Sequence, residues 1–131
     1  MPERIDLEVP ATLTALSTVR LVLGGLAARL DFSLDDLEDI YLATDELLRT
    51  ALDADALDRL SVEVLLDDRE LRFTAGTFRS ARLRADVTTH AEDCLVDLCV
   101  LLRRTVDDVV LEDEDDAYRV VLVKRRKGDP A

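Results

Sequence analysis

The order in which strand-like and helix-like segments follow one another constrains the fold of this chain most. Alternating apolar and polar residues indicate strands, and apolar residues that recur every three or four positions indicate helices. The segment 77–89 shows neither period and is expected to be a loop. The predicted order is β-α-α-β-β-α-β-β, with strands at 5–9, 60–66, 71–75, 106–111 and 118–123 and helices at 12–30, 34–54 and 90–104.

This order favours an α+β fold, a two-layer α/β sandwich with the helices on one face of the sheet. Parallel winding is disfavoured, because the strands fall mostly in hairpins and do not alternate regularly with helices. The chain has 131 residues, enough for one domain, which is expected to span 1–123. Residues 124–131 begin with four basic side chains and are expected to form a flexible tail.

Charge narrows the range of partners. The chain holds 29 acidic and 17 basic residues, a net charge of −12 at pH 7, which repels phosphate backbones and argues against direct nucleic-acid binding. A partner with a basic patch would instead be attracted. Residues 31–58 contain ten acids and one base, Arg49. Such a run is either a solvated helix face or a docking surface.

Glycine is scarce, with only four residues in the chain. Phosphate-binding loops need several glycines, so a P-loop or a dinucleotide fingerprint is excluded. Gly24 and Gly25 lie inside a predicted helix, which each weakens by about 1 kcal/mol relative to alanine. Close packing against a neighbouring element would explain why they are tolerated there.

Membrane and metal sites are not expected. No run approaches eighteen apolar residues, and the first residues lack a signal-peptide pattern, so a cytoplasmic location is expected. Cys94 and Cys99 are then reduced thiols. His90 and Cys94 share a helix face, but two ligands without a second cluster favour small buried side chains over a metal site.

Several motifs together resemble the anti-sigma regulatory factors, the serine-protein kinase branch of the histidine-kinase-like ATPase superfamily. The similarity spans nearly the whole chain and implies the Bergerat-type fold of that superfamily. It also implies a homodimer formed through the first strand and first helix. The motifs are LEVPA at 7–11, LSTVR at 16–20, DFSLDDLEDI at 31–40, LATDE at 42–46, VVL at 109–111 and YRVVLV at 118–123.

The resemblance also assigns nucleotide-site positions, and three of them depart from the family pattern. The family's second helix carries a glutamate and, four residues later, a magnesium-binding asparagine; here these positions are Glu46 and Thr50. The adenine-binding aspartate of the family falls at Ala75, next to Gly76. The family's glycine-rich box would lie in 86–98, which contains no glycine. ATP and magnesium are therefore not expected as cofactors.

Each of these residues also has a structural interpretation. Glu46 can be a solvated residue of the acidic helix, and Gly76 can simply end a strand. The family uses an arginine at the position of Arg20 to contact partner proteins, but a solvated helix arginine is a comparable alternative.

Three functions follow. The first is an anti-sigma-like protein that binds a sigma factor, an anti-anti-sigma protein or both, without kinase activity. The second is an active ATP-dependent serine-protein kinase with Glu46 as its base. The third is an unrelated α+β domain whose acidic helix binds another partner.

Overall fold

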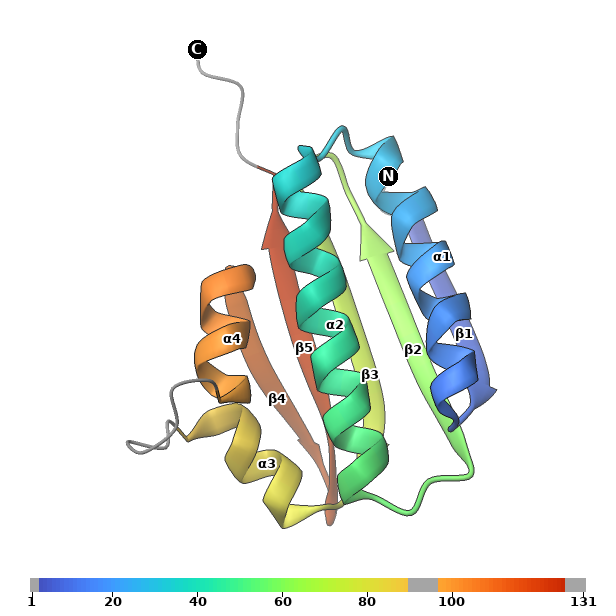
Figure 1. Cartoon of the computed structure of the whole chain (residues 1–131), viewed down its shortest axis with the longest axis vertical. Coiled ribbons are helices and arrows are strands. Elements are labelled where there is room, and N and C mark those ends of the chain that lie inside the picture. Colours follow the sequence, from blue (N-terminus) through green and yellow to red (C-terminus); the bar gives the residue numbers. More distant parts are fainter. Residues whose placement is uncertain (1–2, 90–96, 127–131) are drawn as a thin grey trace.

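The computed structural model describes residues 3–89 and 97–126. A five-stranded antiparallel sheet of strand order β1-β2-β3-β5-β4 carries all the described helices on one face (Figure 1). The predicted α+β sandwich is therefore confirmed. No described helix is both long and apolar enough to cross a membrane. In chain order the elements are β1 Glu3–Pro10, α1 Leu13–Arg29, α2 Leu34–Ala54, β2 Arg59–Leu66, β3 Glu70–Phe78, α3 Ala81–Thr88, α4 Leu98–Thr105, β4 Asp108–Glu114 and β5 Ala117–Arg125.

The core lies between the sheet and the helices, because every second strand residue points towards the helix layer. In β2 these are apolar residues that are at most 3% exposed. In β5 the same alternation buries an aromatic and two aliphatic side chains. Leucine, valine and alanine supply most of the core; its strand members include Leu60, Val62, Val64, Leu66, Phe73, Tyr118, Val120 and Leu122.

Helix α2 has the bounds that the sequence predicted. Its N-cap is Ser33, whose Oγ accepts a hydrogen bond from the backbone N–H of Asp36 at 3.1 Å. The buried face is apolar except for Asp36 and Thr44, and the hydroxyl of Thr44 donates to the carbonyl oxygen of Ile40. The exposed face is acidic, so α2 has two faces of opposite character.

The expected loop at 77–89 is wrong, because residues 81–88 form α3. The amphipathic signal is short: only Leu83 and Val87, one turn apart, are buried. The predicted helix at 90–104 also begins later within the described residues, with Asp97 as the N-cap of α4. Residues 90–96 lie outside the described part of the chain. The fold thus has four described helices instead of three.

The predicted tail boundary at residue 124 is also wrong, because β5 extends to Arg125. Lys124 is only 7% exposed and points towards the helix layer. Its Nζ donates to the carbonyl oxygen of Thr105 at 2.8 Å and to Asp39 at 3.3 Å, and it lies 3.5 Å from Asp36. Lys124 therefore ties the end of β5 to the first turns of α2 and the end of α4, which a solvated tail residue would not do.

Candidate functional site

Glu46 and Thr50 lie one turn apart on α2 and line the same cavity, as their i, i+4 spacing predicts. The cavity has a volume of about 360 Å³ and is bounded by α2, α3 and α4. We call it the α2–α4 cleft. Its other lining residues are Asp53 from α2, Arg82 and Asp86 from α3, and Asp97, Leu98 and Leu101 at the start of α4.

Helix α3, which forms one side of this cleft, is held in place by contacts at its N-cap residue, Ser80. Ser80 caps α3 by accepting from the backbone N–H of Leu83 at 3.1 Å. A carboxylate oxygen of Asp55, just after α2, accepts from the N–H groups of Arg79 and Ser80. The hydroxyl of Tyr118 on β5 donates to the carbonyl oxygen of Ser80 at 2.5 Å. The start of α3 is thus anchored to both α2 and the sheet.

Tyr118 is held in a desolvated, partly charged setting. Burial is the main cause that raises the pKa of its hydroxyl to about 12, and the nearby carboxylate of Asp55 raises that pKa further. The guanidinium of Arg84 lies 5.3 Å from the Tyr118 ring centre and pairs with Asp113 at 2.6 Å. This hydrogen bond from Arg84 lowers the pKa of Asp113. Tyr118 therefore keeps its proton, and its hydrogen bond to Ser80, to a higher pH than an ordinary tyrosine would.

The electrostatics of the α2–α4 cleft do not favour a polyphosphate. Among the described residues, four carboxylates line it, from Glu46, Asp53, Asp86 and Asp97, against one guanidinium, that of Arg82. Asp97 is also committed as a helix cap, because its carboxylate accepts from the N–H of Val100 at 2.8 Å. Phosphate sites in proteins need an excess of N–H donors and basic groups. In the described lining of this cleft, acidic groups instead outnumber basic ones.

Ala75 does not line the cleft. It lies on the helix-facing side of β3, in register with Val62 and Val120, and is 1% exposed within the apolar core. A methyl group cannot accept a hydrogen bond, so this position offers no acceptor to a purine amino group. The structure therefore brings Glu46 and Thr50 together and leaves Ala75 apart from them.

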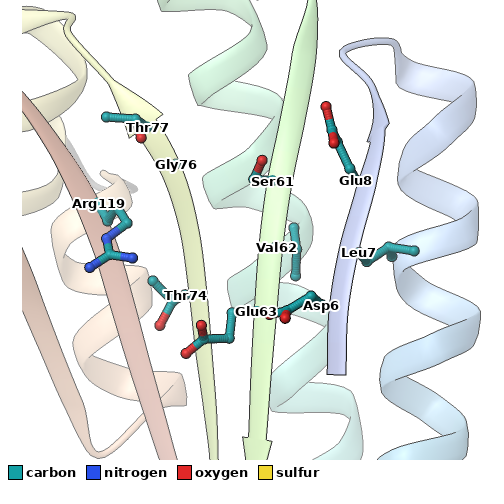
Figure 2. Close-up of a pocket in the computed structure, with 10 residues that line it drawn as sticks. All are labelled: Asp6, Leu7, Glu8, Ser61, Val62, Glu63, Thr74, Gly76, Thr77 and Arg119. Atoms are coloured by element: carbon teal, nitrogen blue, oxygen red, sulfur yellow. The ribbon is translucent and has the colours of Figure 1, made fainter. Parts of the chain in front are cut away.

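Gly76 lies on the opposite face of the sheet (Figure 2). It lines a hollow of about 490 Å³ on the uncovered side, opposite Ser61 and beside Arg119. A Cβ at Gly76 would lie 2.8 Å from Cγ of Arg119 and 3.2 Å from its Cα. Gly76 therefore provides room for Arg119 at the irregular pairing of β3 with β5, which is a packing role.

Arg20 is exposed on α1, and its guanidinium carbon lies 4.4 Å from the centre of the Tyr41 ring on α2. Together they border a mostly apolar groove of about 510 Å³ between the two helices. We call it the α1–α2 groove; its other lining residues are Ser17, Leu21, Gly24 and Gly25. Leu21 is 77% exposed at its edge. The groove brings together an apolar surface and one cation.

Among the cysteines and the histidine, only Cys99 is described. It is 2% exposed on α4, and its sulfur accepts from Nε of Arg103 at 3.4 Å. In the described ranges 3–89 and 97–126, no three metal-ligating side chains gather. His90 and Cys94 lie outside those ranges.

Sequence reasoning missed Asp53, Arg82, Asp86 and Asp97 as lining residues of the cleft. Asp53 follows Glu46 by seven residues, so two helical turns place it on the same face, and this spacing was available as a signal. The other three required α3 and the true start of α4, which the sequence did not predict. Tyr41 and Gly24 were likewise not recognised as neighbours of Arg20.

The similar proteins found by sequence comparison share one description, serine-protein kinase RsbW. The sequence matches no protein-family model. It is 29% identical to the serine-protein kinase RsbW of Halalkalibacterium halodurans, over 98% of this chain and 86% of that protein. It is 26% identical to the serine-protein kinase RsbW of Bacillus mycoides, over 93% of this chain and 84% of that protein.

A solved structure shows the same fold. The crystal structure of the RsbU and RsbW domains of Rv1364c from Mycobacterium tuberculosis superposes with a TM-score of 0.66 at 18% identity. The match covers 95% of this chain and 32% of that longer chain. The predicted histidine-kinase-like ATPase fold is thus confirmed. The chain is a relative of the RsbW serine-protein kinases, in agreement with its resemblance to the anti-sigma regulatory factors.

Proposed function

We propose that this protein is an anti-sigma-like regulator that binds a sigma factor, an anti-anti-sigma protein or both, and that it does so without ATP-dependent kinase activity. The similarity to RsbW over 98% of the chain supports the regulatory role. The observation that carries the proposed loss of kinase activity is the α2–α4 cleft. There Thr50 replaces the expected magnesium ligand, and the described lining holds four carboxylates and one guanidinium.

The cleft supports the loss of kinase activity because phosphoryl transfer depends on positioning and charge neutralisation of the phosphates. Glu46 is in place as a base, but a base alone does not bind a nucleotide. The hydroxyl of Thr50 has a shorter reach than an asparagine amide, and Ala75 supplies no acceptor. Each of these differences weakens a separate contact, so together they oppose nucleotide binding.

The partner side of the proposal is supported by Arg20 and by the acidic surface. Arg20 is exposed and makes no ion pair within residues 3–89 and 97–126, so its charge is accessible to a partner. The net charge of −12 would steer a sigma factor through the basic surfaces with which it contacts DNA. We expect long-range steering by the acids and a local contact at Arg20.

Nucleotide binding is tested by calorimetric titration of the purified protein with ATP and magnesium at millimolar concentration. We expect no saturable heat and no rise in melting temperature. A ligand present at a hundred times its dissociation constant would add about 2.7 kcal/mol of stability, which a thermal shift detects at this size. A micromolar dissociation constant, or transfer of phosphate to an anti-anti-sigma protein, would establish the alternative, an active serine-protein kinase.

Partner binding is tested by measuring the affinity of the purified protein for each sigma factor and anti-anti-sigma protein of the same genome. We expect one tight complex whose association slows as salt rises to physiological strength, where the Debye length is about 8 Å. Failure of all these proteins to bind would refute the regulatory role. Light scattering on the free protein tests the homodimer that the resemblance implies, which we propose forms through β1 and α1.

A further inference from the structure

We infer that Tyr41 and Gly24 act together as positioning residues for Arg20: the ring of Tyr41 holds the guanidinium in place, and the missing side chain at Gly24 leaves room for that ring. The inference rests on the proposed role of Arg20 in partner binding. The supporting observation is that three residues from α1 and α2 lie next to one another. The sequence did not predict these contacts.

The contact between Arg20 and Tyr41 is one of stacking. The guanidinium carbon lies 4.4 Å from the ring centre, within the range in which a cation is attracted to the face of an aromatic ring. A guanidinium that stacks on a ring keeps its N–H groups free at its edge, where a carboxylate or carbonyl can accept from them. Tyr41 therefore restricts the rotamers of Arg20 without using its hydrogen-bonding capacity.

Local carboxylates do not compete for Arg20. Asp45 is next to it, because both line one small cavity, but Asp45 pairs with Arg49 at 2.8 Å on the same helix. In the described part of the chain no carboxylate lies within 4.0 Å of the Arg20 guanidinium nitrogens. In a protein with 29 acidic residues, the ring contact thus leaves an accessible cation on an otherwise acidic surface.

Gly24 makes this arrangement possible. It follows Arg20 by one helical turn, so its side-chain position lies next to the Arg20 side chain on the face of α1. A Cβ at Gly24 would collide with the hydroxyl oxygen of Tyr41 and lie 3.3 Å from ring carbon Cζ. Any other residue would force the Tyr41 side chain to shift from its place against the guanidinium. A Cβ at the neighbouring Gly25 would meet no atom within 4 Å.

The two glycines therefore form a matched pair for experiment. Gly24→Ala and Gly25→Ala make the same chemical change one residue apart in α1. Only the first places an atom against Tyr41. Tyr41→Phe removes the hydroxyl that would collide but keeps the ring, whereas Tyr41→Leu removes the ring altogether.

The first measurement uses the free protein and needs no partner. The arginine Nε–H resonance assigned to Arg20 should be shifted by the ring current of Tyr41 in a ¹⁵N–¹H spectrum. We expect that shift to disappear in Tyr41→Leu, to shrink by at least half in Gly24→Ala, and to persist in Tyr41→Phe and Gly25→Ala. The double variant Gly24→Ala/Tyr41→Phe should regain part of the ring-current shift, because it lacks the hydroxyl that would collide. An Arg20 resonance that is unchanged in Tyr41→Leu would overturn the inference.

The second measurement is the affinity for the sigma factor or anti-anti-sigma protein that binds in the assay described above. We expect Tyr41→Leu to weaken binding at least fivefold and Tyr41→Phe less than twofold. In the Arg20→Ala background, Tyr41→Leu should add less than twofold, because a residue that acts through Arg20 has no effect in its absence.

The outcomes separate this inference from the proposed function. A fivefold loss in Tyr41→Leu that persists in the Arg20→Ala background would mean that Tyr41 contacts the partner itself, and would overturn its role as a positioning residue. If neither protein class binds, the proposed function fails, and the Arg20 resonance in Tyr41→Leu alone decides whether the ring holds the guanidinium.

Discussion

Two hollows flank α2, and they differ in almost every physical respect. Within residues 3–89 and 97–126, the α2–α4 cleft is lined by four carboxylates, one guanidinium, two leucines and Thr50. The described lining of the α1–α2 groove is mostly apolar and includes one cation, Arg20, stacked on an aromatic ring. The same helix supplies Glu46 to one and Tyr41 to the other. One helix thus separates an acidic cleft from an apolar groove that carries an accessible cation, so the two sides of α2 suit ligands of opposite character.

The largest expected effect concerns Lys124, the buried anchor between β5, α2 and α4. Lys124→Ala should destabilise the protein by about 3–5 kcal/mol, because it removes a buried ammonium that pairs with the carboxylates of Asp36 and Asp39 and donates to the carbonyl oxygen of Thr105. The anchor joins α2 to β5 and α4, so its loss should disturb the cleft more than the groove. Urea unfolding measures the change in free energy, and hydrogen exchange compares α4 with α1.

The matched control is Arg125→Ala, one residue further along β5. Arg125 pairs with Asp108 and Glu70 on the surface, with its side chain 55% exposed, so the loss should stay within about 1 kcal/mol. Equal costs for Lys124→Ala and Arg125→Ala would contradict the description of Lys124 as a buried anchor.

The second prediction separates the two hollows by partner affinity. Arg20→Ala should weaken the complex by about 2 kcal/mol, as expected when one member of a desolvated charge pair is removed. Glu46→Gln, in the cleft, should leave the affinity within about 0.5 kcal/mol. Calorimetric titration of each variant with the partner measures both changes.

Arg29→Ala is the control for removal of one positive charge from α1. Arg29 pairs with Glu3 on the surface and lies outside the groove. If Glu46→Gln weakens binding as much as Arg20→Ala, the partner contacts both sides of α2 and the contrast between the two hollows fails.

A third prediction tests the α3 wall of the cleft. The folded-state pKa of Tyr118, about 12, lies above the value near 10 expected for an unfolded tyrosine. The stabilisation is therefore fully present below pH 10 and is lost as pH rises from about 10 to 12. Tyr118→Phe should reduce this alkaline loss and cost about 1 kcal/mol at neutral pH through the hydrogen bond to Ser80. Urea unfolding at pH 8, 10 and 11 measures the cost at neutral pH and the loss of stability at alkaline pH. If Tyr118→Phe loses as much stability as the original protein between pH 8 and 11, the prediction is contradicted.

The smallest expected effect comes from the two glycines of α1. Gly25→Ala should stabilise the protein by about 0.5–1 kcal/mol, because alanine is the better helix former and its Cβ meets no neighbouring atom. Gly24→Ala should give a smaller gain or a loss, since it must displace Tyr41. Thermal unfolding of the two variants side by side measures the difference. If the two substitutions raise the stability equally, Tyr41 can move aside without a cost in free energy.

The sequence predicted the elements whose periodicity is long. Helix α2 spans 21 residues with a serine cap, and the structure reproduces both of its ends. The i, i+4 spacing also placed Glu46 and Thr50 in one cavity. By contrast α3 has eight residues and only two buried apolar side chains, so its period is too short to stand out.

Lys124 shows a different limit of sequence reasoning. Charge alone suggested a tail, although the alternation of Tyr118, Val120 and Leu122 continues to Lys124 and predicts an inward side chain. Its partners Asp36 and Thr105 come from distant segments, and no local pattern predicts such pairing. The close approach of Gly24 and Tyr41 could not be predicted from the sequence either, because the relative rotation of two helices depends on tertiary packing.

The sheet order has a consequence for the kinetics of folding. β2 and β3 pair across a short turn from Leu66 to Leu71, and β4 and β5 pair across another from Glu114 to Ala117. β1, however, pairs Val9 with Leu60 and Glu3 with Leu66, so both long helices lie between the paired residues in the sequence. Contacts so distant in sequence form late, because loop closure costs entropy before they are made. Substitutions in β1 should therefore accelerate unfolding more than they slow folding.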